Sequence, residues 1–144
     1  MIKIICIGKI KENYLKEGIN DYLKRLSKYH KVNLIELPDS SIIDEAKEIS
    51  KYLDSKDYII SLAIEGNSLS SLELSEKIDK TFINYPNITF IIGGSNGLHE
   101  SIKKQSNYLL SFSKLTYPHG LFRLILLEQI YRSFKILNNE TYHK

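Results

Sequence analysis

The sequence predicts an α/β protein in which a parallel-dominated sheet carries helices on both of its faces. Five short apolar runs of strand length alternate with longer segments whose apolar residues recur at helical spacing. Strands that alternate with helices pair in parallel, because each crossover helix returns the chain to the same end of the sheet. The run at residues 88–92 is almost entirely apolar, which is typical of a strand buried on both faces. A chain of 144 residues can bury one core, so we expect one domain over residues 1–144.

The first half of the chain supplies three expected strands and two expected helices. The apolar start, Ile2–Gly8, is the first strand, and Asn13–Tyr29 has one apolar helical face opposite a face rich in lysine and arginine. Val32–Leu37 is a second strand that ends at a proline. Aspartate and serine residues then offer caps for a polar helix over Ile42–Leu53, and a third strand follows over Tyr58–Ile64.

The second half begins with a helix start signal, since Ser70 and Glu73 form a capping-box pattern before a helix that runs toward Tyr85. The elements expected after it are the strand at residues 88–92, a short helix over Leu98–Gln105, a strand near Tyr108–Phe112 and a long helix over His119–Leu137. This last helix is apolar over more than one face. We therefore expect part of it to pack against a second subunit, in a homodimer.

Two consecutive glycines, Gly93 and Gly94, follow the fourth strand. Because neither carries a Cβ, we expect the chain to turn there at positive φ, so that a flat ligand lies against main-chain groups at the carboxyl end of the strand. The loop Ser111–Gly120 follows the fifth strand and emerges at the same edge of the sheet, where it can close over such a ligand. This geometry suits a nucleoside. The alternative is a tight strand-to-helix turn that binds nothing.

Composition and missing motifs exclude several classes of protein. The single cysteine, Cys6, rules out an internal disulfide, and its apolar surroundings predict a buried thiol. The N-terminal apolar run is too short for a signal peptide and no later run reaches membrane-spanning length, so we expect a cytoplasmic protein without membrane contact. Glycine fingerprints of dinucleotide and phosphate sites, metal-ligand spacings and Ser-His-Asp patterns are absent, which disfavours nicotinamide, ATP and metal chemistry.

Charge is unevenly distributed along the chain, although the formal net charge is only +3. Residues 1–31 carry eight Lys/Arg against three Asp/Glu, residues 32–85 carry five against eleven, and residues 86–144 carry seven against three. Both ends are therefore basic and the middle is acidic. Such segregation favours a positive face that meets a polyanion, and the alternative is a set of solvated helix faces.

A family resemblance extends these inferences. The segment FIIGGSNGLHESIKKQSNYLLSFSKLTYPHGLFRLILLEQIYRSFKI, the ending YHK and the start IKIICIGKIKENYLKEGINDYLKRL together closely resemble the ribosomal large subunit methyltransferase H family of the SPOUT superfamily. The resemblance implies methyl transfer from S-adenosylmethionine to N3 of a pseudouridine in helix 69 of 23S rRNA, by a homodimer that acts on assembled ribosomes. It also implies a SPOUT-type α/β fold with a C-terminal trefoil knot.

The resemblance also assigns roles to particular residues. The cofactor positions of the family match Leu62, Gly93, Phe112, Ser113, Lys114, Leu115, Thr116 and Tyr117. Its catalytic positions match Arg132, Tyr142 and His143, and Lys144 matches a substrate-binding position. These last residues are expected beside the target nucleotide, reaching across to the cofactor of the partner subunit. Without the resemblance, we would interpret Arg132 as a surface charge and Tyr142 to Lys144 as a frayed tail.

One segment departs from the family pattern, since Pro38 to Asp57 is shorter than in the relatives compared, which puts peripheral contact with the ribosome in doubt. His99 and His119 are expected to shape helix starts and stand outside the catalytic set. A second functional hypothesis is a non-catalytic nucleotide-binding or sensor module with the same α/β fold. Binding of S-adenosylmethionine without methylation of ribosomes would favour it.

Overall fold

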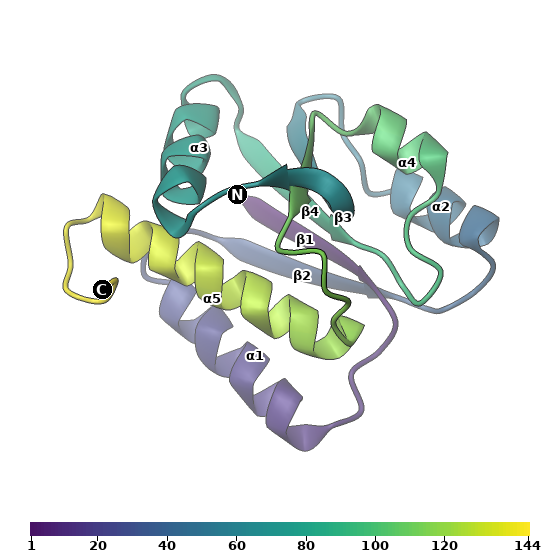
Figure 1. Ribbon diagram of the computed structural model, residues 1–144, viewed down its shortest axis with the longest axis horizontal. Helices are drawn as coiled ribbons and strands as arrows, with labels where there is room; N and C mark the ends of the chain where they lie inside the picture. Colours follow the sequence, from purple (N-terminus) through teal and green to yellow (C-terminus); the bar gives the residue numbers. More distant parts are fainter.

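The computed structural model describes residues 1–144 and contains one five-stranded sheet in the order β2-β1-β4-β3-β5 (Figure 1). All four strand pairings are parallel, which confirms the expected sheet. The strands are β1 (Ile2–Ile7), β2 (Val32–Leu37), β3 (Asp57–Ser68), β4 (Asn87–Ile92) and β5 (Tyr108–Ser111). The central strands β1 and β4 are buried almost throughout, as their continuous apolar sequences predict.

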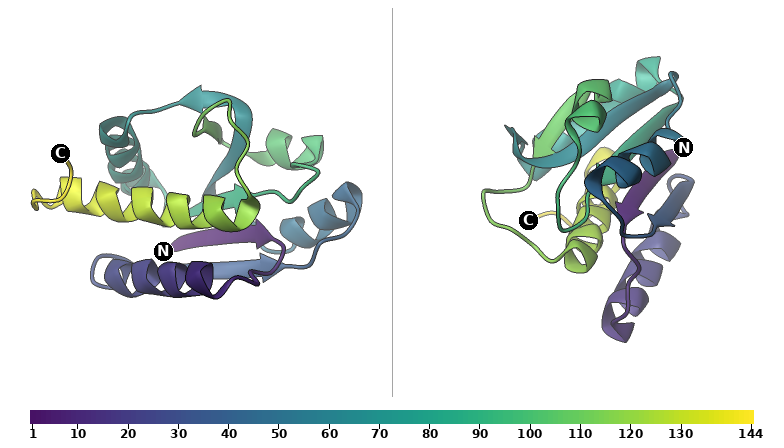
Figure 2. Two further views of the ribbon diagram at one scale, coloured as in Figure 1. Left: turned by 60° about the horizontal axis from the view of Figure 1, so that its bottom comes forward. Right: turned by 90° about the vertical axis from the view of Figure 1, so that its right-hand side faces the viewer.

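Helices cover both faces of the sheet (Figures 1 and 2), and the sheet therefore separates two hydrophobic cores, one on each face. Successive residues of β1 alternate between these cores: Ile4 and Cys6 face one, and Ile5 and Ile7 face the other. The larger core lies under α1 (Asn13–Leu26), α3 (Ser71–Asn84) and α5 (His119–Leu137), and the smaller under α2 (Ile42–Ser50) and α4 (Glu100–Gln105). None of these helices is long and apolar enough to cross a membrane.

The helix boundaries follow their capping groups. Ser70 and Glu73 form the predicted capping box at the start of α3, with both reciprocal hydrogen bonds present. Two helices end three residues earlier than expected, α1 at Leu26 and α2 at Ser50. At the end of α1 the hydroxyl of Ser27 donates to the carbonyl oxygen of Lys24 over 2.6 Å, which diverts that carbonyl from a further helical turn.

Strand β3 is longer than predicted. The strand was expected to end at Ile64, but β3 continues to Ser68 along β5. Its pairing with β5 shifts register between Leu62 and Asn67, because both residues lie opposite Leu110. Gly66 makes the close approach possible, since a Cβ there would stand 2.7 Å from the carbonyl oxygen of Leu109. The irregular stretch lies where β3 pairs with the edge strand β5, and bulges near sheet edges often re-aim side chains toward a site.

The terminal helix α5 packs on the sheet between α1 and α3, which accounts for much of its broad apolar surface (Figure 2). Leu126, Leu127 and Ile130 are fully buried within their own chain. Leu126 is therefore a core residue and not a candidate for a subunit contact. Leu121 and Ile125 stay partly exposed on the outer side of the helix.

A buried ionic group ties three strands together at the amino end of the sheet. Asp57 accepts hydrogen bonds from Asn87 and Thr89, each over 3.0 Å, and lies 2.9 Å from the ammonium of Lys3. Burial alone raises the pKa of the Asp57 carboxyl, but the hydrogen bonds outweigh burial and hold that pKa below its ordinary value. On β1, burial raises the pKa of the Cys6 thiol to about 12, as expected for a thiol in the core.

Candidate functional site

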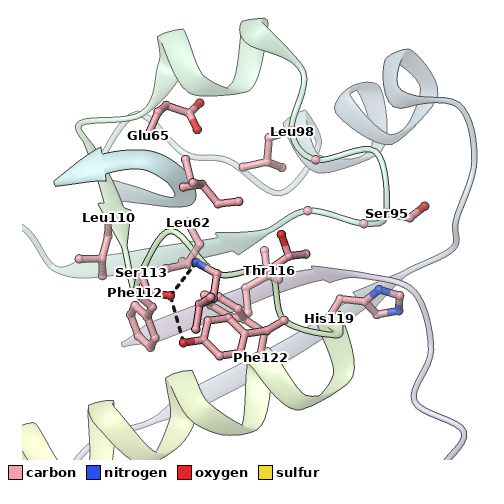
Figure 3. Close-up of a pocket in the computed structure, with 18 of the residues that line it drawn as sticks. Leu62, Glu65, Ser95, Leu98, Leu110, Phe112, Ser113, Thr116, His119 and Phe122 are labelled. Atoms are coloured by element: carbon pink, nitrogen blue, oxygen red, sulfur yellow. Dashed lines mark hydrogen bonds between the residues drawn. The ribbon is translucent and has the colours of Figure 1, made fainter. Parts of the chain in front are cut away.

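A cavity of about 650 Å³ opens at the carboxyl ends of β4 and β5, along residues 62–65 of β3 and beside the start of α5 (Figure 3). Its walls include seven of the eight predicted cofactor residues: Leu62, Gly93, Phe112, Ser113, Leu115, Thr116 and Tyr117. Lys114 is exposed and does not line the cavity. The predicted edge of the sheet therefore carries a concave, largely apolar pocket of the size that small-molecule ligands occupy.

The glycines after β4 border this pocket, but Gly93 and Gly94 do not have the positive φ that was expected. Positive φ occurs at Gly97 (74°) and not at Gly93 or Gly94. Gly93 is needed for close packing, because a Cβ there would lie 2.7 Å from the carbonyl oxygen of Gly97. The amide of Gly97 donates to the carbonyl oxygen of Gly94 over 3.0 Å, which closes a tight turn. The loop thus presents main chain, without side-chain bulk, along one wall of the cavity.

The loop after β5 forms the opposite wall and is held by its own side chains. The Ser113 hydroxyl accepts a hydrogen bond from the amide of Leu115 over 3.0 Å and lies 3.1 Å from the hydroxyl of Tyr117 (Figure 3). The rings of Phe112 and Tyr117 both pack on Phe122 of α5, with centroids 5.1 and 5.4 Å away. Leu115 remains 69% exposed, so an apolar side chain stands uncovered at the cavity.

Three ionisable side chains at the cavity were not in the predicted cofactor set: Glu65, Lys103 and His119. Glu65 of β3 and Lys103 of α4 form an ion pair with Oε1 and Nζ 2.5 Å apart. The hydrogen bond from Lys103 lowers the pKa of Glu65, and Glu65 raises the pKa of Lys103. The extension of β3, which the sequence did not indicate, is what brings Glu65 to the cavity.

The two remaining predicted helix-start histidines behave differently. His99 is the N-cap of α4, because its Nδ1 accepts a hydrogen bond from the amide of Ser101 over 3.1 Å, as expected. His119 is the first residue of α5 but makes no capping hydrogen bond. Its Nε2 lies 3.1 Å from the position that a Cβ on Gly8 would take, so its ring stands between the cavity and the end of β1.

The predicted catalytic residues form a second cluster at the far end of α5. The Arg132 guanidinium pairs with Glu128 over 2.6 and 3.0 Å, and the Tyr142 hydroxyl donates to the same carboxylate over 3.0 Å. Arg132 also lies over the Tyr142 ring, 4.8 Å from its centroid. Nη1 of Arg132 is 3.1 Å from Nδ1 of His143. The structure thus brings Arg132, Tyr142 and His143 together around Glu128, whose role the sequence did not indicate.

The C-terminal tail folds back on α5. A turn with positive φ at Asn139 reverses the chain, and Glu140 then accepts hydrogen bonds from Tyr29 and Lys135 over 2.8 and 2.9 Å. The Tyr142 ring packs edge-on against Tyr131 at 5.1 Å. These contacts do not fit the frayed-tail alternative. Lys144 is exposed at the end of this tail.

The loop before α5 and the C-terminal tail lie at opposite ends of that helix (Figure 2), and so do the cavity at His119 and the predicted catalytic cluster at Arg132. His119 and Arg132 are separated by 13 residues of helix, which corresponds to roughly 20 Å at the α-helical rise. A ligand in the cavity is therefore out of reach of Arg132 from the same chain.

Arg123 is a buried residue that sequence reasoning missed. Its side chain is fully buried, pairs with Glu36 over 2.8 Å and donates to the carbonyl oxygens of Ile7 and Gly8 over 3.3 and 3.1 Å. The end of β1 is thereby fixed to α5 beside the cavity, because Ile7 borders Gly94. The only trace of Arg123 in the sequence is a single arginine within the apolar run of α5, because its partners Ile7, Gly8 and Glu36 are distant in the chain.

Comparisons with known proteins agree with this architecture. Residues 1–143 match the family model described as predicted SPOUT methyltransferase. The chain is 51% identical to a ribosomal RNA large subunit methyltransferase H of Clostridium botulinum and 47% identical to one of Streptococcus suis, with 99% of each chain covered. Both alignments span 157 residues, so these relatives carry residues that this chain lacks.

Among solved structures, the fold is similar to that of a probable methylase family protein of Haemophilus influenzae, with a TM-score of 0.58 and 15% identity. That likeness covers 99% of this chain and 70% of the other and concerns the fold alone.

Proposed function

This chain belongs to the SPOUT methyltransferases and, within them, to the ribosomal RNA large subunit methyltransferase H family, and from that premise we propose that it transfers a methyl group from S-adenosylmethionine to 23S rRNA. The acceptor is N3 of a pseudouridine in helix 69, on assembled ribosomes in the cytoplasm. The observation that carries the proposal is the pocket itself, which gathers seven of the eight family cofactor positions around one cavity. The C-terminal trefoil knot stays a prediction of the resemblance.

The cavity fits S-adenosylmethionine, which supplies a methyl group on a positively charged sulfonium when it is bound. Apolar walls at Leu62 and Leu115 suit the flat adenine, and the main chain at Gly93 offers hydrogen-bonding groups without side-chain bulk. The packed rings of Phe112 and Tyr117 hold the covering loop in shape. The pocket contributes chiefly by positioning, because methyl transfer is an in-line displacement.

The catalytic cluster is suited to the acceptor, whose N3 gives up its proton to solvent water as it attacks the methyl group. Arg132 stays protonated, because the hydrogen bonds that it donates to Glu128 raise its pKa, so it stabilises the negative charge that spreads over the base. Burial, together with hydrogen bonds to Tyr22 and Glu128, raises the pKa of Tyr142, which therefore acts as a neutral phenol and as a surface on which a base can stack.

The contact of His143 with Arg132 supports an orienting role for His143. A guanidinium has only donors, so the 3.1 Å contact between Nη1 and Nδ1 requires a lone pair on Nδ1. The other ring nitrogen, Nε2, takes no part in this contact and is proposed to hydrogen-bond a carbonyl oxygen of the base. Lys144, exposed beside it, is proposed to meet phosphate groups of the RNA.

A homodimer explains how two clusters roughly 20 Å apart along one helix serve one reaction. In a two-fold symmetric contact through the outer side of α5, the start of one helix lies beside the end of the other. Each cavity then receives Arg132 and the tail from the partner subunit. Leu121 and Ile125, left partly exposed on that side, supply apolar contact area. Replacing Ile125 by aspartate should yield a monomer in sedimentation experiments, and a wild-type chain that is already monomeric at micromolar concentration would contradict the dimer.

A methylation assay tests the function directly. Ribosomes from a strain that lacks the activity are incubated with the protein and radiolabelled S-adenosylmethionine, and the label is mapped in 23S rRNA by nuclease digestion and mass spectrometry. We expect one labelled pseudouridine in helix 69, carrying the methyl group on N3. A protein that binds S-adenosylmethionine yet labels no ribosomal RNA would favour the non-catalytic sensor module instead.

A further inference from the structure

The cavity contains one pair of opposite charges in otherwise apolar or small polar surroundings. Glu65 comes from the extended half of β3 and Lys103 from α4, and their Oε1 and Nζ atoms are 2.5 Å apart. The other side chains of the lining are apolar, hydroxyl-bearing or absent at glycines, apart from His119. In a ligand pocket, a few polar groups placed among apolar walls set the orientation of the ligand.

We propose that Glu65 and Lys103 recognise the α-amino acid end of S-adenosylmethionine, with Lys103 binding its carboxylate and Glu65 its ammonium group. The inference rests on the function proposed above. A zwitterion presents a negative and a positive group side by side, and the ion pair presents the complementary two charges. When the ligand binds, the ion pair between Glu65 and Lys103 is replaced by one ion pair from each side chain to the ligand. Both side chains keep a counter-charge, so this replacement carries little electrostatic cost.

The placement of the pair agrees with the shape of the ligand. Glu65 lies on one side of the cavity, and Phe112, Ser113 and Phe122 lie on the other (Figure 3). The aromatic side suits the nucleoside, which needs apolar surface and main-chain hydrogen bonds, whereas the charged side suits the amino acid. The Glu65 and Lys103 side chains retain 56% and 21% exposure, so both can change rotamer to accept a ligand.

A purely structural role, in which the ion pair ties β3 to α4, makes a different prediction. Such a tie would affect every ligand of the cavity equally, together with the melting temperature. Recognition of the amino acid end instead affects only ligands that carry it. Two nucleosides separate these cases, because S-adenosylhomocysteine has the amino acid end and 5′-methylthioadenosine lacks it.

The test measures binding of both nucleosides by isothermal titration calorimetry. Lys103→Met keeps the alkyl stem and removes the charge, and Glu65→Gln keeps the shape and removes the charge. Lys104→Met is the matched control, because Lys104 is the next residue of α4, is exposed and does not line the cavity. We expect Lys103→Met and Glu65→Gln each to weaken S-adenosylhomocysteine binding by about tenfold to hundredfold, as for hydrogen bonds between charged groups. Binding of 5′-methylthioadenosine should stay within about twofold of wild type, and the control should match wild type for both ligands.

The outcomes separate this inference from the proposed function. Equal weakening of both nucleosides by Lys103→Met, or no weakening of either, overturns the recognition of the amino acid end while leaving the nucleoside site in place. A wild-type protein that binds neither nucleoside overturns the cofactor assignment itself. Melting temperatures of the variants within a few degrees of wild type are also expected, because both side chains are partly exposed.

Discussion

Complementation between two inactive variants is the sharpest test of a site built from two chains. Thr116→Trp places a large ring in the cavity from an exposed position, so it blocks the cofactor without disturbing the core. Arg132→Ala removes the guanidinium of the cluster and leaves the cavity intact. Each variant alone should be inactive. In a heterodimer, the cavity of the Arg132→Ala chain meets the intact cluster of the Thr116→Trp chain, so one of the two sites regains every part.

The expected recovery follows from the geometry. Arg132 lies 13 residues of helix from the start of α5, roughly 20 Å away, so it cannot serve the cavity of its own chain. Random mixing makes about half of the dimers heterodimeric, each with one working site, which gives about a quarter of wild-type activity per subunit. The two variants are unfolded together, refolded and assayed by methyl transfer to ribosomes. A mixture as inactive as its parents would refute the two-chain site.

A second mixture provides the control for this experiment. Deletion of residues 142–144 and Arg132→Ala both damage the same cluster, because Arg132 and His143 lie 3.1 Å apart within one chain. Every heterodimer site then lacks either the guanidinium or the tail, so no recovery is expected. The deletion alone should leave S-adenosylmethionine affinity nearly unchanged, because the residues that line the cavity do not include the tail. Recovery in this mixture would mean that Arg132 and His143 act in different sites.

Three further predictions concern Arg123, Asp57 and Gly93. Arg123→Leu should lower the free energy of unfolding by roughly 2–5 kcal/mol in urea titrations, because it leaves the carbonyl oxygens of two residues at the end of β1 without a donor; an unchanged midpoint would contradict this reading. The pKa of Asp57 is lower in the folded state than its ordinary 3.8, so the stability it contributes is present above that pH and is lost as the pH falls through the folded value. Asp57→Asn should therefore lose less stability than wild type between pH 5 and pH 2, as measured by denaturant unfolding at each pH. Gly93→Ala should lower both the melting temperature and the affinity for S-adenosylmethionine, because its Cβ meets the main chain of Gly97, and a fully stable variant with normal affinity would show that the turn can yield.

The architecture could be predicted because it depends on local patterns. Apolar runs of strand length and capping residues such as Ser70 act within a few residues, and both sheet type and helix starts follow from them. The path of β3 beyond Ile64 could not be predicted in this way. Glu65, Gly66 and Asn67 look like a turn in sequence, and only pairing with a strand more than forty residues later makes them a strand.

In the candidate site, too, features marked by local sequence could be predicted, whereas features that depend on distant partners could not. The loop after β5 was predicted from its place at the carboxyl edge of the sheet, the family resemblance then assigned its residues, and the structure places most of it at the cavity. Arg123 and Glu128 were missed because their partners come from other elements, so no local spacing reveals them. The glycine turn was placed correctly but for the wrong reason, since Gly93 is required by a close main-chain contact and not by its φ. Long-range packing decides such details, and a single sequence records it only indirectly.

The buried thiol of Cys6 makes this chain convenient for spectroscopic work. A thiol whose pKa is about 12 is almost entirely protonated at neutral pH, and in the middle of the sheet it is also shielded from reagents. A cysteine introduced at an exposed position, such as that of Lys144, would therefore take a maleimide fluorophore without competition from the native one. Emission from that dye would follow the tail as ribosomes are added. The slow rate at which Cys6 itself is labelled would report how often the whole sheet unfolds.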